Sequence, residues 1–171
     1  MKKFAFAFLA LMSLCLSPFT GSAETLDEPT MKAKLSELFG DKSSWIPASL
    51  KDLKRDMPCE DAKKIFTAIP ACDATKEYDL INVPVQNSPI LEGYLFNFQY
   101  GKLYSVNYIF QKTLDKELFK KVSLEAGEAK WGALEAEKKA GDVLTWMDSS
   151  GSIVQRSYKS NQWQIKVIFP I

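Results

Sequence analysis

The chain has 171 residues, with 22 lysine and arginine side chains against 21 aspartate and glutamate, and it contains no histidine. This nearly balanced charge does not favour binding to nucleic acid or to an anionic membrane. The absence of histidine excludes Ser-His-Asp and Cys-His nucleophiles, histidine-ligated metals and histidine acid–base chemistry.

The N-terminal segment has the pattern of a secretory signal peptide. Lys2 and Lys3 are followed by an apolar run over 4–16 and by Gly21-Ser22-Ala23, which predicts a signal peptide over residues 1–23 cleaved after Ala23. A membrane anchor is the alternative, but the run is shorter than the roughly 20 residues that span a bilayer. Cys15 would suit a lipoprotein, but the residue before it is leucine rather than a small residue. We expect export by a bacterium to the periplasm or the medium.

The remaining residues, 24–171, are expected to form a single domain without an integral membrane span. Apolar residues recur at helical spacing in three early segments. These predict a helix from Pro29 to Phe39 closed by Gly40, a short helix over 49–57 and a helix over 61–69 that Pro70 ends.

Cys59 and Cys72 are predicted to form a disulfide, because they are the cysteines that remain after signal cleavage in an oxidising compartment. Two free buried thiols are the alternative. A disulfide needs Cα atoms within about 7 Å, whereas a helix of about 10 residues is about 15 Å long. Either the chain turns back after Ile69 or the helix is shorter than its pattern indicates.

The segment from Glu92 to Gln111 is predicted to be a β-hairpin on which the core is built. Aromatic and branched residues alternate along both arms, as in strands with one buried face; they are Tyr94, Phe96, Phe98, Tyr104, Val106, Tyr108 and Phe110. A preceding strand over 78–85 contains Pro84, which predicts an edge position or a bulge.

The register of this hairpin is predicted from parity. A two-residue loop at Tyr100-Gly101 would place Phe96 opposite Ser105 and mix the two faces. A three-residue loop that includes Gln99 pairs Phe96 with Tyr104 instead, and it keeps the aromatic residues together.

The second half of the chain repeats this layout. It predicts a helix over 115–131, a loop over 133–141 and strands over 143–148, 152–158 and 162–169. The whole indicates an α+β domain, order α-α-α-βββ-α-βββ, in which helices cover one face of a meandering antiparallel sheet of about six strands. The halves share their order but almost no residue identity, and the layout resembles that of secreted β-lactamase-inhibitor-like modules.

The sequence contains no pattern for a catalytic, cofactor or metal site. If the aromatic residues face the helices, the other sheet face is rich in uncharged polar groups, and its candidate binding residues are Asn97, Ser105, Asn107, Gln155, Gln164 and Lys166, interrupted by Leu95 and Leu103. Such a face suits recognition of a protein or an extended ligand, and an ordinary solvated face is the alternative.

The function predicted from these features is that of a non-catalytic binding or envelope-associated module, which recognises a protein or an extended ligand through the open sheet face. A periplasmic or secreted protein is the expected partner. Two alternatives remain open. One is an apolar-ligand carrier with a cavity between sheet and helices. The other is a hydrolase that uses two converging carboxylates.

Overall fold

The computed structural model describes residues 26–135, 139 and 141–170. The predicted signal peptide, residues 1–23, and part of the predicted loop over 133–141 lie outside this range. The described residues include no helix that is long and apolar enough to cross a membrane.

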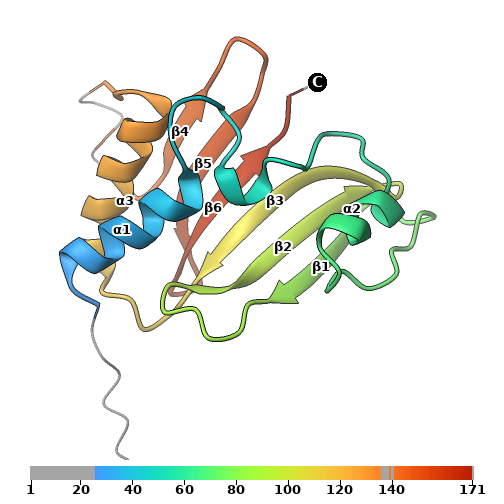
Figure 1. Ribbon diagram of the computed structural model, residues 1–171, viewed down its shortest axis with the longest axis horizontal. Coiled ribbons are helices and arrows are strands. Elements are labelled where there is room, and N and C mark those ends of the chain that lie inside the picture. Colours follow the sequence, from blue (N-terminus) through green and yellow to red (C-terminus); the bar gives the residue numbers. More distant parts are fainter. Residues whose placement is uncertain (1–25, 136–138, 140, 171) are drawn as a thin grey trace, which may run out of the picture.

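Helices and strands follow one another in the predicted order, and the α+β class is confirmed (Figure 1). The elements are α1 (Glu28–Phe39), the 3-10 helix η1 (Ala48–Leu50), α2 (Cys59–Ile65), β1 (Asp79–Pro84), β2 (Leu91–Gln99), β3 (Lys102–Phe110), α3 (Lys116–Trp131), β4 (Leu144–Met147), β5 (Ile153–Lys159) and β6 (Gln162–Ile168).

The six strands form one sheet in the order β1-β2-β3-β6-β5-β4, and every neighbouring pair is antiparallel. Two three-stranded meanders therefore meet along the pair β3–β6. The hairpin turns next to this pair match each other, because Tyr100-Gly101 and Ser160-Asn161 all have positive φ, as type I′ turns require. Pro84 lies in β1 at one edge of the sheet, where its missing N–H disrupts no ladder.

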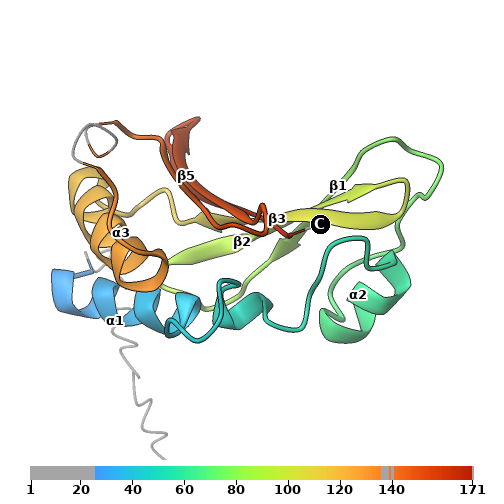
Figure 2. The ribbon, with the colours of Figure 1, turned by 90° about the horizontal axis from the view of Figure 1, so that it is seen from above.

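The helices lie on one face of the sheet, and no described helix covers the other (Figure 2). The core between these layers is made of the inward side chains of the strands and the buried side chains of the helices. Its largest members, all less than 2% exposed, include Phe96, Phe98, Tyr108, Phe110 and Trp163.

The predicted register of the β2–β3 hairpin is wrong, because a β-bulge, and not a three-residue loop, keeps the core residues of the two strands on one face. Gln99 pairs with Lys102, so the turn has two residues, and Asn97 pairs with Ser105. Tyr104 has no partner on β2, because the register shifts between these two pairs. This β-bulge restores the parity that a three-residue loop was expected to provide, and it sets Phe96 opposite Val106 rather than Tyr104.

The bulge also exchanges two side chains between the faces. Leu103 was expected on the outer face and is fully buried in the core. Tyr104 was expected in the core and is only half-buried. A bulge adds one residue to one strand, so each side chain beyond it changes face relative to unbroken alternation.

Helix α1 ends at Phe39 as predicted and begins one residue earlier than predicted, at Glu28, and it packs against α3. Asp27 accepts a hydrogen bond from the Thr30 N–H at 2.9 Å, and the Gly40 N–H donates to the Ser36 carbonyl. Two ion pairs join the helices on the surface, Lys121 to Glu28 at 2.7 Å and Lys32 to Glu125 at 3.0 Å.

The segment predicted as a helix over 49–57 forms η1 and turns instead. Leu50 and Leu53 are buried as their spacing suggested, but Asp56 has φ 59°, which interrupts a helix. The Asp56 N–H donates to the Leu103 carbonyl, and the Met57 carbonyl accepts from the Leu103 N–H at 2.8 Å. The end of this segment therefore pairs with β3, while local turn bonds, such as Leu53 N–H to the Leu50 carbonyl, replace a continuous helix.

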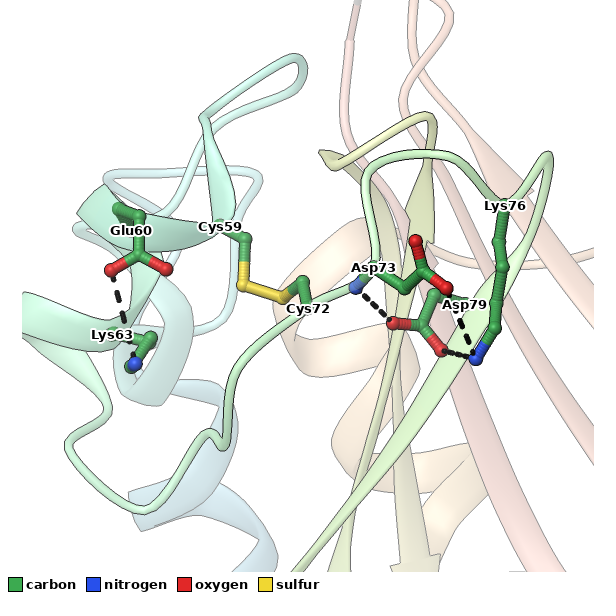
Figure 3. Close-up of a disulfide and its surroundings, with 7 residues drawn as sticks. All are labelled: Cys59, Glu60, Lys63, Cys72, Asp73, Lys76 and Asp79. Atoms are coloured by element: carbon green, nitrogen blue, oxygen red, sulfur yellow. Dashed lines mark hydrogen bonds and ion pairs between the residues drawn. A yellow bond between two sulfur atoms is a disulfide. The ribbon is translucent and has the colours of Figure 1, made fainter.

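The predicted disulfide between Cys59 and Cys72 is present, with a Cα–Cα distance of 6.2 Å (Figure 3). The short distance is possible because α2 ends at Ile65, earlier than its apolar pattern indicated. The chain after α2 then turns back, and an Asp73–Lys76–Asp79 cluster follows the bond on the way to β1.

Candidate functional site

The sheet has two chemically different faces. Paired residues of neighbouring strands point to the same side, so the register assigns each side chain. The side away from the helices, here called the open face, consists of Leu80, Asn82, Pro84, Leu95, Asn97, Ser105, Asn107, Ile109, Thr145, Met147, Ile153, Gln155, Ser157, Lys159, Gln162, Gln164, Lys166 and Ile168.

The structure places all six predicted polar residues on the open face. They lie on the four central strands: Asn97 on β2, Ser105 and Asn107 on β3, Gln164 and Lys166 on β6, and Gln155 on β5. Lys166 is at the middle of this group, because it pairs with Asn107 on one side and with Gln155 on the other.

The polar groups of the open face make few hydrogen bonds to one another. The Asn107 amide donates to Gln164 Oε1 at 3.5 Å, the limit of a hydrogen bond, and Gln155 donates to Thr145 Oγ1 at 3.2 Å. Asn97 Oδ1 and Ser105 Oγ are buried and have no hydrogen-bond partner among the described residues. Each such atom costs about 1–3 kcal/mol if it stays unsatisfied, so the face has unused hydrogen-bonding capacity.

Apolar side chains are mixed with these polar groups. Leu80 and Met147, on the two outermost strands, are 61% and 63% exposed. Between them the half-buried apolar residues are Leu95, Ile109, Ile153 and Ile168. The face is thus partly apolar and rich in amides across its whole width, a composition found in protein interfaces.

Tyr104 adds an aromatic ring between two cations to this face. The Arg55 guanidinium carbon lies 4.9 Å from the centre of the ring, and Lys166 Nζ lies 5.7 Å from it. Both are within the range of cation–π contacts. Sequence reasoning missed Tyr104 and Arg55, because alternation without a bulge puts Tyr104 in the core and nothing in the sequence predicts the bulge.

The inner face also contains a buried cation, Arg156. Its guanidinium donates to the Lys120 carbonyl at 2.7 Å, to Ser123 Oγ at 3.0 Å and to the Gly141 carbonyl at 3.2 Å. Burial lowers the pKa of Arg156 to about 10, which leaves it charged at neutral pH. Arg156 thus fastens α3 and the loop before β4 to the sheet.

The structure offers no support for the two alternative functions. The space that a carrier would need is occupied by aromatic rings, such as Phe110, Phe119 and Trp163, whose successive centroids are 4.6 and 5.4 Å apart. A hollow of about 490 Å³ between α1 and the β1–β2 loop has Glu37 as its carboxylate, and one of about 670 Å³ beside β4 is lined by Trp45, Trp131 and Trp146 and by no carboxylate of the described residues. Neither brings together the two acids that a hydrolase would need.

Metal binding is equally unsupported within the described part of the chain, where no group of three or more His, Cys, Asp or Glu side chains is arranged to hold an ion. Comparison with protein-family models, with curated proteins and with solved structures gives no match. The open face therefore has to be interpreted from its own residues.

Proposed function

We propose that this chain is a non-catalytic binding module that recognises a protein partner through the open face. The observation that supports this is the position of the six polar residues. They lie together on central strands among half-buried apolar side chains, and no helix of the described part of the chain covers them. Isolated amides on a solvated face would have no such apolar surroundings.

The partner is proposed to be a periplasmic or secreted protein. This rests on the signal peptide predicted for residues 1–23 and is supported by the Cys59–Cys72 bond, since disulfides persist in oxidising compartments. Binding rather than catalysis is proposed because no described hollow contains paired acids.

The test uses the mature chain and a library of short random-sequence peptides displayed on phage. For the peptides selected, we expect Asn97→Glu and Gln164→Glu to weaken binding at least about tenfold, because a new charge in the contact must be desolvated. Thr113→Glu, which adds the same charge in the exposed loop before α3, should leave the dissociation constant unchanged.

Circular dichroism of each variant checks that the fold is retained. Full affinity in both open-face variants, or a library that yields no binder at all, would refute the proposal.

A further inference from the structure

Tyr104, Arg55 and Lys166 form a cluster on the open face in which neither cation is ion-paired with a described residue. Arg55 and Lys166 are both half-buried against the Tyr104 ring, and neither forms an ion pair with any described residue. Several other lysines of the described residues are ion-paired, for example Lys64 with Asp61 at 2.6 Å. Two cations held at one ring without a carboxylate leave a local positive potential.

The backbone holds this cluster in place. Arg55 precedes Asp56 and Met57, whose backbone groups are hydrogen-bonded to Leu103 at 2.9 and 2.8 Å. Tyr104 is held at the bulge, between the paired residues Leu103 and Ser105, and Lys166 is held by its pairing with Asn107. The three side chains thus come from segments far apart in sequence that the sheet brings together, so the cluster is preorganised rather than a result of long flexible chains meeting by chance.

The other charges of the strands do not neutralise it. The strands contain two carboxylates, Asp79 and Glu92. Asp79 lies 3.6 Å from Lys76 in the loop before β1, and Glu92 accepts a hydrogen bond from Gln162 at 2.6 Å at the opposite end of β2. The open face therefore carries an excess of positive charge, although the chain as a whole is nearly neutral.

We propose that the Arg55–Tyr104–Lys166 cluster is a binding site for a carboxylate, and that it recognises an aspartate or glutamate side chain of the protein partner. The inference rests on the proposed function and specifies the chemistry of the partner: an acidic residue flanked by apolar ones. Arg55 offers a planar donor for the carboxylate and Lys166 a point charge. Leu95 and Ile168 supply the apolar surface beside them.

The experiment compares each selected peptide with a twin in which Glu is replaced by Gln and Asp by Asn. We expect the selected peptides to be enriched in acidic residues and their amide twins to bind about tenfold more weakly. Arg55→Gln and Lys166→Gln should each weaken binding of the acidic peptide to a similar extent. In both variants the difference in affinity between the acidic peptide and its amide twin should be smaller than in the native chain.

Lys159→Gln is the matched control, because it removes a lysine from the same sheet face about 13 Å further along the strands. It should change the dissociation constant less than about twofold. Tyr104→Leu keeps apolar area but removes the ring, and it should also reduce the discrimination between acid and amide.

The outcomes separate this inference from the proposed function. If acidic peptides and amide twins bind equally while Asn97→Glu still weakens both, the carboxylate site is refuted and the binding face stands. If Lys159→Gln weakens binding as much as Lys166→Gln, the effect is the general charge of the face and the site is likewise refuted. If no peptide responds to Asn97→Glu or Gln164→Glu, the open face itself is refuted.

Discussion

At Gly127 the backbone of α3 comes so close to the indole of Trp146 that no side chain fits between them. A Cβ atom there would lie 2.6 Å from two carbons of the ring. The Trp146 N–H donates to the Gly132 carbonyl at 3.1 Å, which fixes the ring at the end of the same helix. This contact explains a glycine inside a continuous helix, where glycine alone costs about 1 kcal/mol.

Gly127→Ala is therefore expected to destabilise the protein although alanine is the better helix former. Overpacking against Trp146 costs about 1–3 kcal/mol and outweighs the gain in helix propensity, so we expect a net loss of about 1 kcal/mol or more in the free energy of unfolding. Urea denaturation measures it. Gly141→Ala, whose Cβ would have its nearest neighbours at 3.7 Å, is the control and should stay within about 0.5 kcal/mol. A stabilised Gly127→Ala variant would contradict the close approach.

Tyr108 is a buried phenol with one hydrogen bond. Its hydroxyl lies 2.7 Å from Ser49 Oγ, which itself donates to the Leu38 carbonyl, so the tyrosine is the donor. Desolvation raises the pKa of Tyr108 well above its usual value, against the opposing effect of the Ser49 hydrogen bond. The unfolded chain loses this proton near pH 10, so the contribution of Tyr108 to stability is present below about pH 10 and is lost above it.

We expect Tyr108→Phe to lower the free energy of unfolding by about 1 kcal/mol at neutral pH, through the lost hydrogen bond. Above about pH 10 the stability of the variant should fall less steeply than that of the native chain, because phenylalanine has no proton to lose. Urea denaturation across alkaline pH tests both. Tyr100→Phe, in the exposed turn, should follow the native curve, and a Tyr108→Phe curve parallel to the native one would be evidence against the assignment.

Helix α2 is stabilised by bonds to other segments of the chain. It has 7 residues, too few for a stable helix in isolation. The disulfide joins its first residue to Cys72, and the Cys59 N–H donates to the Gly101 carbonyl in the β2–β3 turn at 3.0 Å. Two bonds at Cys59 thus hold the start of the helix, the disulfide to the segment before β1 and the backbone hydrogen bond to the β2–β3 turn.

Removing the disulfide should cost about 2–4 kcal/mol, because it closes a loop between residues 13 apart and restricts the unfolded chain. The measurement is thermal or urea unfolding of the native chain and of the double variant Cys59→Ser, Cys72→Ser. A reductant should lower the midpoint of the native chain and leave that of the double variant unchanged. An equal effect of reductant on both would show that the bond is not responsible.

The β2–β3 hairpin shows where prediction from the sequence stops. Alternation of Tyr94, Phe96 and Phe98 was enough to predict which face is buried, because a strand has a period of two. Parity alone could not decide between a longer loop and a bulge, since both bring Phe96 opposite a core residue. The bulge is accompanied by two hydrogen bonds, from the Asp56 N–H to the Leu103 carbonyl and from the Leu103 N–H to the Met57 carbonyl. These contacts join distant segments, and no local pattern encodes them.

At the scale of the whole molecule, one part of the candidate site could be predicted from the sequence and another part could not. The six polar residues could be predicted to share a face because each alternates with a core residue on its own strand, and the register confirms their common side. The cluster of Arg55, Tyr104 and Lys166 could not be predicted, because it requires a bulge, a non-helical segment at Arg55 and the β3–β6 pairing at the same time. That this face binds a protein remains a prediction.

The strand order has a consequence for the time course of folding. The last strand in the chain, β6, lies at the centre of the sheet between β3 and β5. A chain that emerges N-terminus first can form the β1–β2–β3 meander early, but β3 keeps one edge unpaired until Gln162–Ile168 arrives. Non-local pairing of this kind is slow, and an exposed central edge attracts other strands. The interval before β6 docks is thus when the chain is most exposed to aggregation, and chaperone protection would matter most then.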